Sequence, residues 1–382
     1  MSQILIPYVL GKPKKLAKRL FADWLIAWYQ ANKRELPWRS TQDPYRIWLS
    51  EVILQQTRVL QGLPYYQRFV EQYPTVQALA AAQEEAVLRL WQGLGYYSRA
   101  RNLHACARMV VDQFNGTFPN NYKDLLRLKG VGSYTAAAIA SIAFQEQVPV
   151  VDGNVYRVLA RVFGVAEDIA STSGQKIFYK LAQSLVPAQR PDLYNQAIME
   201  FGAIQCRPAK PLCQTCIFKV HCVAFQTGRQ QSFPIKQPRL KIKQRFFHYF
   251  VIQLADKVYM RLRKGADIWQ GLYDFYLVED SQLREADQLA DELVALMGHH
   301  QLSIVKDPRL YKHALTHRRL HVYFFYVQAT AQFVQEAAPM LDRMHMHAFS
   351  LAETKDLPKS RLISNFLEDK LYITPRLQTF KP

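Results

Sequence analysis

One stretch of the sequence places a turn suited to binding an anion close to a carboxylate. Gly130, Val131 and Gly132 precede a segment of small residues, and Asp152 follows that segment in Val-Asp-Gly-Asn. A Gly-x-Gly turn before a helix lets backbone N–H groups face an anion, and phosphate is the commonest such anion. Asp152 would then lie beside the molecule that carries the phosphate. The same pattern is equally compatible with an ordinary helix start and an Asp that caps the next helix.

A second carboxylate, Glu51, lies in the apolar stretch Ile-Trp-Leu-Ser-Glu-Val-Ile-Leu. Burial disfavours the charged form of a carboxyl, so its pKa would rise toward the working pH and would suit a general acid. Taken alone, Glu51 is also compatible with the exposed surface of a helix.

Four of the five cysteines gather between positions 206 and 222, and they are Cys206, Cys213, Cys216 and Cys222. Disulfides are rare inside cells, so four thiolates around a metal centre is the better interpretation. Zinc and a [4Fe–4S] cluster both accept four cysteines, but a structural zinc site usually has two short pairs, and only the middle pair is short here. The fifth, Cys106, is expected to be a buried apolar residue.

The elements that must position these residues are mostly helices. Apolar residues recur at helical spacing, as at Leu16, Leu20, Trp24 and Trp28. The predicted helices cover 16–32, a segment from about 47, and 75–82, 84–91, 100–114, 122–129, 134–144, 154–163, 175–185 and 192–204.

The pattern of residues changes after a polar, basic segment that contains Pro234 and Pro238. Beyond it, aromatic and β-branched runs predict strands, and one helical segment separates them. The strands are expected over 246–254, 257–264 and 321–329, and the helix over 283–297. We therefore predict a helical domain over 1–222, a linker over 223–243, an α+β domain over 244–370 and a tail over 371–382.

Composition agrees with a folded protein of two or three domains, since the chain has 382 residues and 49% of them are hydrophobic. The net charge of +18 suits a polyanionic partner, although charge alone is a weak signal. No apolar run reaches the roughly 18 residues of a membrane span, and the N-terminus lacks the order of a secretory signal. An intracellular protein without membrane contact is expected.

Three further segments carry a family resemblance. They are Leu36-Pro37-Trp38-Arg39, SEVILQQTRV at 50–59 and WQGLGYYSR at 91–99. With the Gly-Val-Gly turn and the cysteines, they resemble helix-hairpin-helix DNA glycosylases of the endonuclease III type, and among these the MutY-type adenine DNA glycosylases. The motifs are dense over 36–222 and continue more weakly to about 365. The resemblance implies a monomer that removes adenine opposite 8-oxoguanine or guanine in double-stranded DNA, carries one [4Fe–4S] cluster on the four cysteines, and works in a bacterial-type cytoplasm at the nucleoid.

The resemblance also assigns catalytic roles. Hydrolysis of the N-glycosidic bond requires a protonated leaving base and a stabilised sugar cation. Glu51 would protonate adenine N7 and activate water, and Asp152 would stabilise or trap the cation. Tyr134 stands where bifunctional relatives have a lysine that forms a Schiff base and cuts the strand. Because a phenol cannot form an imine, we expect a monofunctional glycosylase, with Tyr134 and Asn154 positioning Asp152.

The adenine must leave the base stack to be reached. The resemblance places Arg39 and Gln196 against the flipped base, whereas Gln56 and Tyr96 would enter the duplex and fill the vacated space. The other positions implied to contact DNA or the base are Trp38, Gly130 and Gly132.

The C-terminal part resembles the Nudix-like domain that reads 8-oxoguanine in this family, since 268–275 (IWQGLYDF) match its turn. The carboxylates that follow lack the spacing of the Nudix metal box, so no pyrophosphatase activity and no magnesium site are expected. Thr316 and His317 stand where the family carries the hydroxyl and imidazole of a loop against 8-oxoguanine. Leu315 replaces the aromatic residue of that loop.

Three alternatives remain open at this point. A glycosylase with lyase activity on damaged pyrimidines is disfavoured by Tyr134 and by the Glu51 motif. A non-catalytic iron-sulfur protein that binds DNA is disfavoured by the intact Glu51 and Asp152. A Nudix hydrolase with an accessory helical domain is disfavoured by the missing metal box.

Overall fold

The computed structural model describes residues 17–237, 242–284, 288, 289, 291, 292, 295, 303–306, 310–315 and 318–369. Thr316 and His317, most of the predicted helix over 283–297 and the tail lie outside the described residues. The chain forms two compact units. The first consists of Met1–Ala80 with Ala105–Pro238, and the second of Ala81–His104 with Arg239–Pro382.

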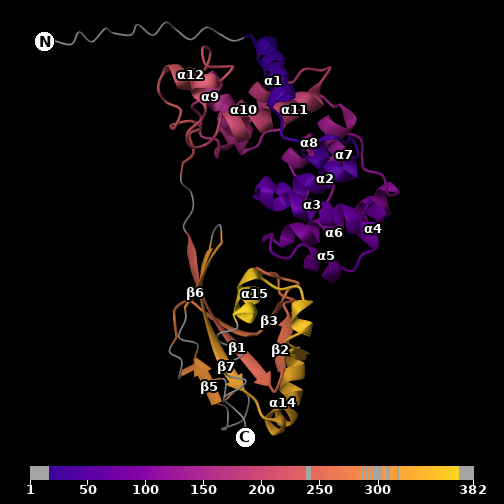
Figure 1. Ribbon diagram of the computed structural model, residues 1–382, viewed down its shortest axis with the longest axis vertical. Helices are drawn as coiled ribbons and strands as arrows, with labels where there is room; N and C mark the ends of the chain where they lie inside the picture. Colours follow the sequence, from indigo (N-terminus) through magenta and orange to yellow (C-terminus); the bar gives the residue numbers. More distant parts are fainter. Residues whose placement is uncertain are drawn as a thin grey trace, which may run out of the picture. The chain divides into compact units, whose positions relative to one another are not determined.

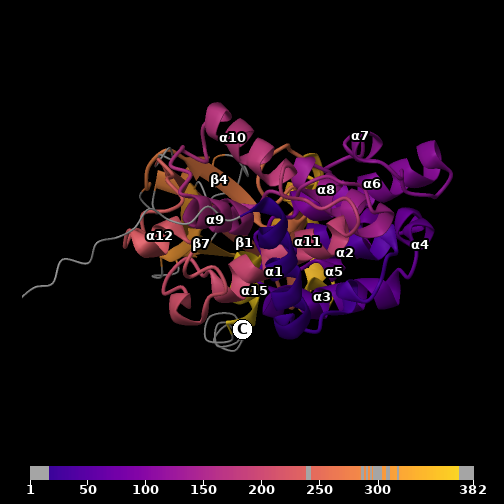
Figure 2. The same ribbon diagram turned by 90° about the horizontal axis from the view of Figure 1, so that it is seen from above.

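The first unit is built around α8 (Ser133–Phe144), which packs against α2 (Pro44–Leu54), α7 (Tyr122–Leu125) and α11 (Pro191–Glu200) (Figure 1). Four of the five alanines of α8 are buried, and their small side chains let neighbouring helices approach closely. The first helix, α1 (Lys18–Asn32), lies against α11 (Figure 2). Helices from both ends of this part of the sequence thus surround α8.

The predicted helices of this region are present, and their ends differ by a few residues from the expected ones. The other elements in the order of the chain are η1 (Pro37–Arg39), α3 (Val59–Gln72), α4 (Val76–Ala81), α9 (Gly153–Phe163), α10 (Thr172–Gln183), the π-helical turn η2 (Phe201–Gln205), η3 (Cys213–Thr215) and α12 (Val223–Gln226).

Helix α3 was not predicted, and it contains Pro64. Proline lacks the N–H that would bond the carbonyl one turn earlier, at Leu60. The helix forms nevertheless because Tyr66 and Phe69 on its inner face are buried. The predicted helix over 192–204 also differs, since regular α-helix ends at Glu200 and a π-helical turn follows.

The second unit is built on a mixed sheet. Its central strand β1 (Lys243–Leu254) runs parallel to β7 (Arg318–Gln328) and antiparallel to β2 (Lys257–Leu262) and β4 (Tyr276–Asp280). The described strands follow the order β3-β2-β1-β7-β5, with β6 on β7 and β8 on β2. These remaining strands are β3 (Tyr273–Asp274), β5 (Ser303–Lys306), β6 (Tyr311–Ala314) and β8 (His347–Ser350).

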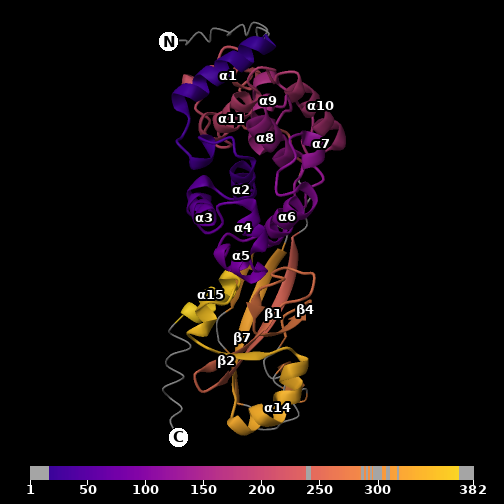
Figure 3. The same ribbon diagram turned by 90° about the vertical axis from the view of Figure 1, so that its right-hand side faces the viewer.

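Helices cover both faces of this sheet (Figure 3). Phe247 of β1 packs on one face with α15 (Arg361–Glu368), whereas Phe250 packs on the other with α14 (Ala331–Arg343). The unit also contains α5 (Glu84–Leu90), the first part of α6 (Ser98–Phe114) and η4 (Glu353–Lys355). None of the helices in the described ranges is long and apolar enough to cross a membrane.

Candidate active site

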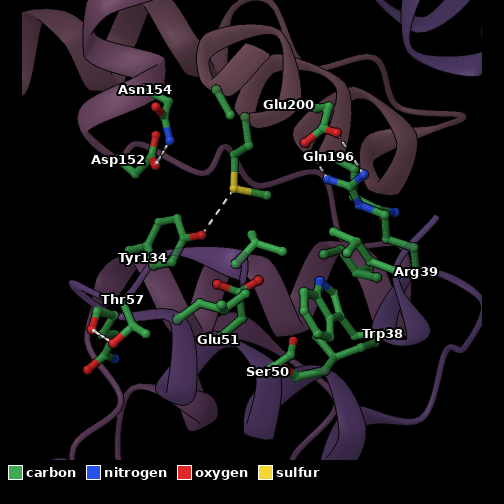
Figure 4. Close-up of a pocket in the computed structure, with 18 of the residues that line it drawn as sticks. Trp38, Arg39, Ser50, Glu51, Thr57, Tyr134, Asp152, Asn154, Gln196 and Glu200 are labelled. Atoms are coloured by element: carbon green, nitrogen blue, oxygen red, sulfur yellow. Dashed lines mark hydrogen bonds and ion pairs between the residues drawn. The ribbon is translucent and has the colours of Figure 1, made fainter. Parts of the chain in front are cut away.

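A pocket of about 370 Å³ in the first unit brings most of the predicted site residues together (Figure 4). Helix α2 supplies Glu51, the start of α8 supplies Tyr134, and the start of α9 supplies Asn154, with Asp152 just before it. The predicted residues that line the pocket are Trp38, Arg39, Glu51, Gln56, Tyr134, Asp152, Asn154 and Gln196.

Glu51 lies in the middle of α2, and only 9% of its surface is exposed. Burial raises the pKa of its carboxyl to about 7, and the charge of Asp152 adds to this rise. Tyr134 and Arg39 act in the opposite direction. The carboxyl is therefore partly protonated at neutral pH and can donate a proton to a molecule in the pocket.

Asp152 is the N-cap of α9, so its side chain is fixed by the start of that helix. Its Oδ1 accepts a hydrogen bond from the backbone N–H of Val155 at 2.8 Å, and its Oδ2 accepts one from Asn154 Nδ2, also at 2.8 Å. Burial raises the pKa of Asp152, and these hydrogen bonds oppose the rise. They stabilise the charged form of a carboxylate that the pocket would otherwise neutralise.

Tyr134 is the second residue of α8, and its hydroxyl donates a hydrogen bond to Met199 Sδ at 3.0 Å. Burial and the neighbouring carboxyls of Glu51 and Asp152 raise the pKa of Tyr134 well above its ordinary value. The phenol therefore stays protonated. Within the part of the chain that the structure describes, no lysine lines the pocket.

The far wall of the pocket is held by an ion cluster that was not predicted. The Glu200 carboxylate accepts hydrogen bonds from Arg39 at 2.6 and 3.0 Å and from the Arg34 side chain at 2.6 and 2.7 Å. Burial opposes ionisation of Glu200, but these hydrogen bonds lower its pKa to about 2. Arg39 is thus fixed by a permanent negative charge, and Tyr29 donates to Gln196 Oε1 at 3.1 Å on the same wall.

A signal for this wall was present in the sequence. Met199 and Glu200 follow Gln196 by three and four residues, which places all three on one face of α11. Their partners Arg34 and Tyr29 come from a distant part of the chain, which helical periodicity alone cannot identify.

Arg157, on α9, connects the pocket with the cysteine segment. Its Nη2 donates to Asn154 Oδ1 at 2.8 Å and to the Gly202 carbonyl at 2.7 Å, and its Nε donates to the Cys206 carbonyl at 2.8 Å. The side chain that holds Asp152 is therefore itself held by a buried guanidinium. This residue was also missed by sequence reasoning.

The four cysteines of segment 206–222 lie near one another. Burial, followed by the charge of neighbouring thiols such as Cys206, raises the pKa of Cys216 to about 12 and that of Cys222 to about 11. All three other thiols contribute at Cys216. Arg161 donates to Cys206 Sγ at 3.5 Å. Over the described ranges, no three or more His, Cys, Asp or Glu side chains are placed to hold a single metal ion.

The remaining predicted residues lie elsewhere. Tyr96 belongs to the second unit, is 47% exposed and lines a different cavity, of about 740 Å³. Gly130 and Gly132 form the turn before α8, where the φ of +74° at Gly130 favours glycine. Thr316 and His317 lie outside the described residues.

The sequence matches two families. Residues 49–187 match the family described as HhH-GPD superfamily base excision DNA repair protein, and residues 248–369 match the NUDIX domain. The predicted fold, a helix-hairpin-helix domain followed by a Nudix-like domain, is thereby confirmed.

Individual proteins are similar over longer stretches. An adenine DNA glycosylase of Buchnera aphidicola subsp. Acyrthosiphon pisum is 30% identical over 261 residues, which cover 68% of this chain and 75% of that protein. An adenine DNA glycosylase of Homo sapiens is 46% identical over 221 residues, 56% of this chain and 40% of that protein. A solved thermostable thymine-DNA glycosylase aligns with a TM-score of 0.50 at 30% identity, covering 55% of this chain and 97% of that one.

Proposed function

The chain belongs to the family of adenine DNA glycosylases, which are hydrolases of N-glycosyl bonds, and on this premise we propose which substrate it takes and how. The proposed substrate is adenine opposite 8-oxoguanine or guanine in duplex DNA, bound by a monomer. The adenine rotates out of the stack into the pocket that Glu51 and Asp152 line.

The observation that carries this proposal is the pair of carboxyls on opposite sides of one pocket, with Tyr134 between them (Figure 4). The Glu51 carboxyl, with a pKa of about 7, protonates the leaving adenine and later activates water. The ionised form of Asp152, which the hydrogen bonds from Val155 and Asn154 favour, stabilises the positive charge that develops on the sugar. Each carboxyl thus has an environment suited to its role.

The wall of the pocket that Glu200 holds in place supplies the contacts to the base. Arg39 and Gln196 offer hydrogen-bonding groups, and Trp38 offers an aromatic surface. Because Glu200 holds Arg39 and Tyr29 orients Gln196, these contacts are preorganised before the base arrives.

We infer that the product is an intact abasic site. Cleavage through a Schiff base requires an amine nucleophile, and the residue that faces both carboxyls is Tyr134, a phenol. Among the described residues that line the pocket, none is a lysine that could act as this nucleophile.

We further infer that Cys206, Cys213, Cys216 and Cys222 hold a [4Fe–4S] cluster. The thiols lie close enough to raise one another's pKa, and N–H groups of Arg161 and Phe218 point at sulfur atoms, as expected around an anionic sulfur centre. When bound, the cluster would cross-link segment 206–222 and so stabilise the Cys206 backbone, whose carbonyl accepts a hydrogen bond from Arg157.

Recognition of the opposite base is assigned to the Nudix-like domain, with Thr316 and His317 as the contacting side chains. Gln56, at the pocket, and Tyr96, in the second unit, are assigned to the space that the flipped adenine leaves. The Gly130–Gly132 turn is assigned to the DNA backbone, because a turn before a helix presents N–H groups to phosphate.

A single-turnover incubation tests the proposal. The chain is mixed in excess with duplex DNA that carries one adenine opposite 8-oxoguanine, and samples are analysed with and without hot alkali. Strand breaks that appear only after alkali are expected. Breaks without alkali would contradict the monofunctional mechanism, and an absence of breaks despite DNA binding would contradict the catalytic assignment.

A further inference from the structure

The segment between α5 and α6 presents an exposed aromatic ring on an unusually constrained backbone. Gly93, Gly95 and Tyr96 have φ angles of +97°, +73° and +50°, so Tyr96 adopts a left-handed conformation that side chains rarely accept. The residue Tyr96 is 47% exposed. Backbone strain of this kind persists only where the surroundings determine it, and it concentrates at functional positions.

The surroundings that determine it are two side chains that meet at one carbonyl. Trp91 Nε1 donates to the Gly95 carbonyl at 3.0 Å, and Arg99 Nη2 donates to the same oxygen at 3.3 Å. The backbone N–H of Arg99 also donates to the Tyr96 carbonyl at 2.8 Å. The peptide between Gly95 and Tyr96 is therefore fixed by hydrogen bonds from a residue before it, Trp91, and a residue after it, Arg99.

Arg99 also contacts the ring itself. Its guanidinium carbon lies 5.5 Å from the centre of the Tyr96 ring and 5.0 Å from that of the Trp91 ring. Trp91 is fully buried and Arg99 is 8% exposed, so the guanidinium packs against a ring that is held in the protein core. A cation over an aromatic face is attracted by the ring, more strongly where water is excluded.

We propose that Arg99 is a positioning residue that holds Tyr96 rigid and ready to enter duplex DNA. The proposal rests on the proposed function, in which Tyr96 fills the space left by the flipped adenine. A side chain ordered before binding loses less conformational entropy when it inserts, so the contact contributes more to affinity. Arg99 acts through Tyr96 and needs no contact with DNA of its own.

A double-mutant cycle tests this dependence. In the 382-residue chain with Glu51→Gln, affinity for duplex DNA with adenine opposite 8-oxoguanine is measured with Arg99→Met, Tyr96→Ala and both changes together. We expect Arg99→Met to weaken binding about tenfold when Tyr96 is present and less than about twofold when it is absent. Arg89→Met, which removes a cation from the exposed pair with Asp356, is the control and should bind normally.

A second readout reports on insertion directly. A 2-aminopurine placed next to the mispair should brighten when Tyr96 disturbs the stack, and this signal should fall equally in Arg99→Met and Tyr96→Ala. If Arg99→Met fails to fold, Arg99→Lys enters the same cycle, because lysine keeps the charge but not the planar contact with the ring.

Equal losses of affinity with and without Tyr96 would overturn the proposal, since Arg99 would then act independently of the ring. Unchanged binding by Tyr96→Ala would overturn it too. Adenine release by the unsubstituted chain, measured separately, reports on the proposed function, so failure of one is distinguishable from failure of the other.

Discussion

Glu51 and Asp152, the two carboxyls proposed to act in catalysis, differ in environment, and this difference predicts how adenine release depends on pH. Glu51 must be protonated to act as an acid, and burial places its pKa at about 7. Asp152 must be charged, and its pKa is raised from its ordinary value. Single-turnover rates should therefore fall as pH rises above about 7 and fall again at acidic pH, giving a bell-shaped profile. A rate that stays constant well above pH 7 would show that Glu51 is not the acid.

The same pKa shift has a consequence for stability. Because the pKa of Glu51 is raised by folding from 4.5 to about 7, its contribution to stability is fully present at acidic pH and is lost as pH rises through 7. Glu51→Gln cannot ionise and escapes this loss. Denaturant unfolding should show the variant gaining about 3 kcal/mol relative to the parent between pH 4 and pH 8. Equal pH dependence of the two proteins would contradict a buried, titrating Glu51.

Glu200 should matter more for stability than an exposed acidic residue. Its side chain is 1% exposed and balances Arg34 and Arg39, so Glu200→Gln leaves two guanidiniums near a buried neutral amide. We expect a loss of about 3 kcal/mol in unfolding free energy, together with slower adenine release. Asp356→Asn, which breaks the exposed pair with Arg89, is the control and should cost at most about 1 kcal/mol. Similar losses in both variants would contradict this interpretation.

At the scale of elements, local patterns predicted most helices but not the places where tertiary packing overrides them. Helix α3 contains Pro64, which local rules treat as a break, yet the burial of Phe69 keeps the helix intact. The change from α11 to a π-helical turn after Glu200 is not marked by any residue that signals a break as clearly as a proline does. That turn is what brings the Gly202 carbonyl to Arg157.

The close approach of this turn to α9 yields a prediction. A Cβ added at Gly202 would lie 2.6 Å from Asn154 Cβ and 3.1 Å from the Asn154 carbonyl oxygen. Gly202→Ala should displace Asn154 and so loosen Asp152, costing about 1–3 kcal/mol of stability and slowing release more than DNA binding. Gly265→Ala, where an added Cβ meets no atom within 4 Å, is the matched control. Normal single-turnover rates in Gly202→Ala would refute the link between turn and catalysis.

At the scale of the molecule, sequence motifs predicted the candidate catalytic residues but not the side chains that hold them in place. Glu51, Tyr134 and Asp152 stand in long, ordered motifs, and the structure places all three at one pocket. Arg34 and Glu200 lie 166 positions apart, and only the folded chain shows that they share an ion cluster. Contacts of such long range follow from the packing of α1 against α11, which no local pattern encodes.

The second unit is proposed to recognise the base opposite adenine. This is tested by a variant that should lose the preference for 8-oxoguanine over guanine but keep the ability to release adenine. Thr316→Ala with His317→Ala removes the hydroxyl and imidazole proposed to contact 8-oxoguanine, while the pocket of Glu51 and Asp152 remains unchanged. The ratio of single-turnover rates for adenine opposite 8-oxoguanine and opposite guanine should fall by about tenfold, because a well-placed pair of hydrogen bonds to a base is worth about 1–3 kcal/mol of discrimination. The rate opposite guanine should barely change. A loss shared equally by both substrates would place these residues in general DNA binding, and an unchanged ratio would remove them from recognition altogether.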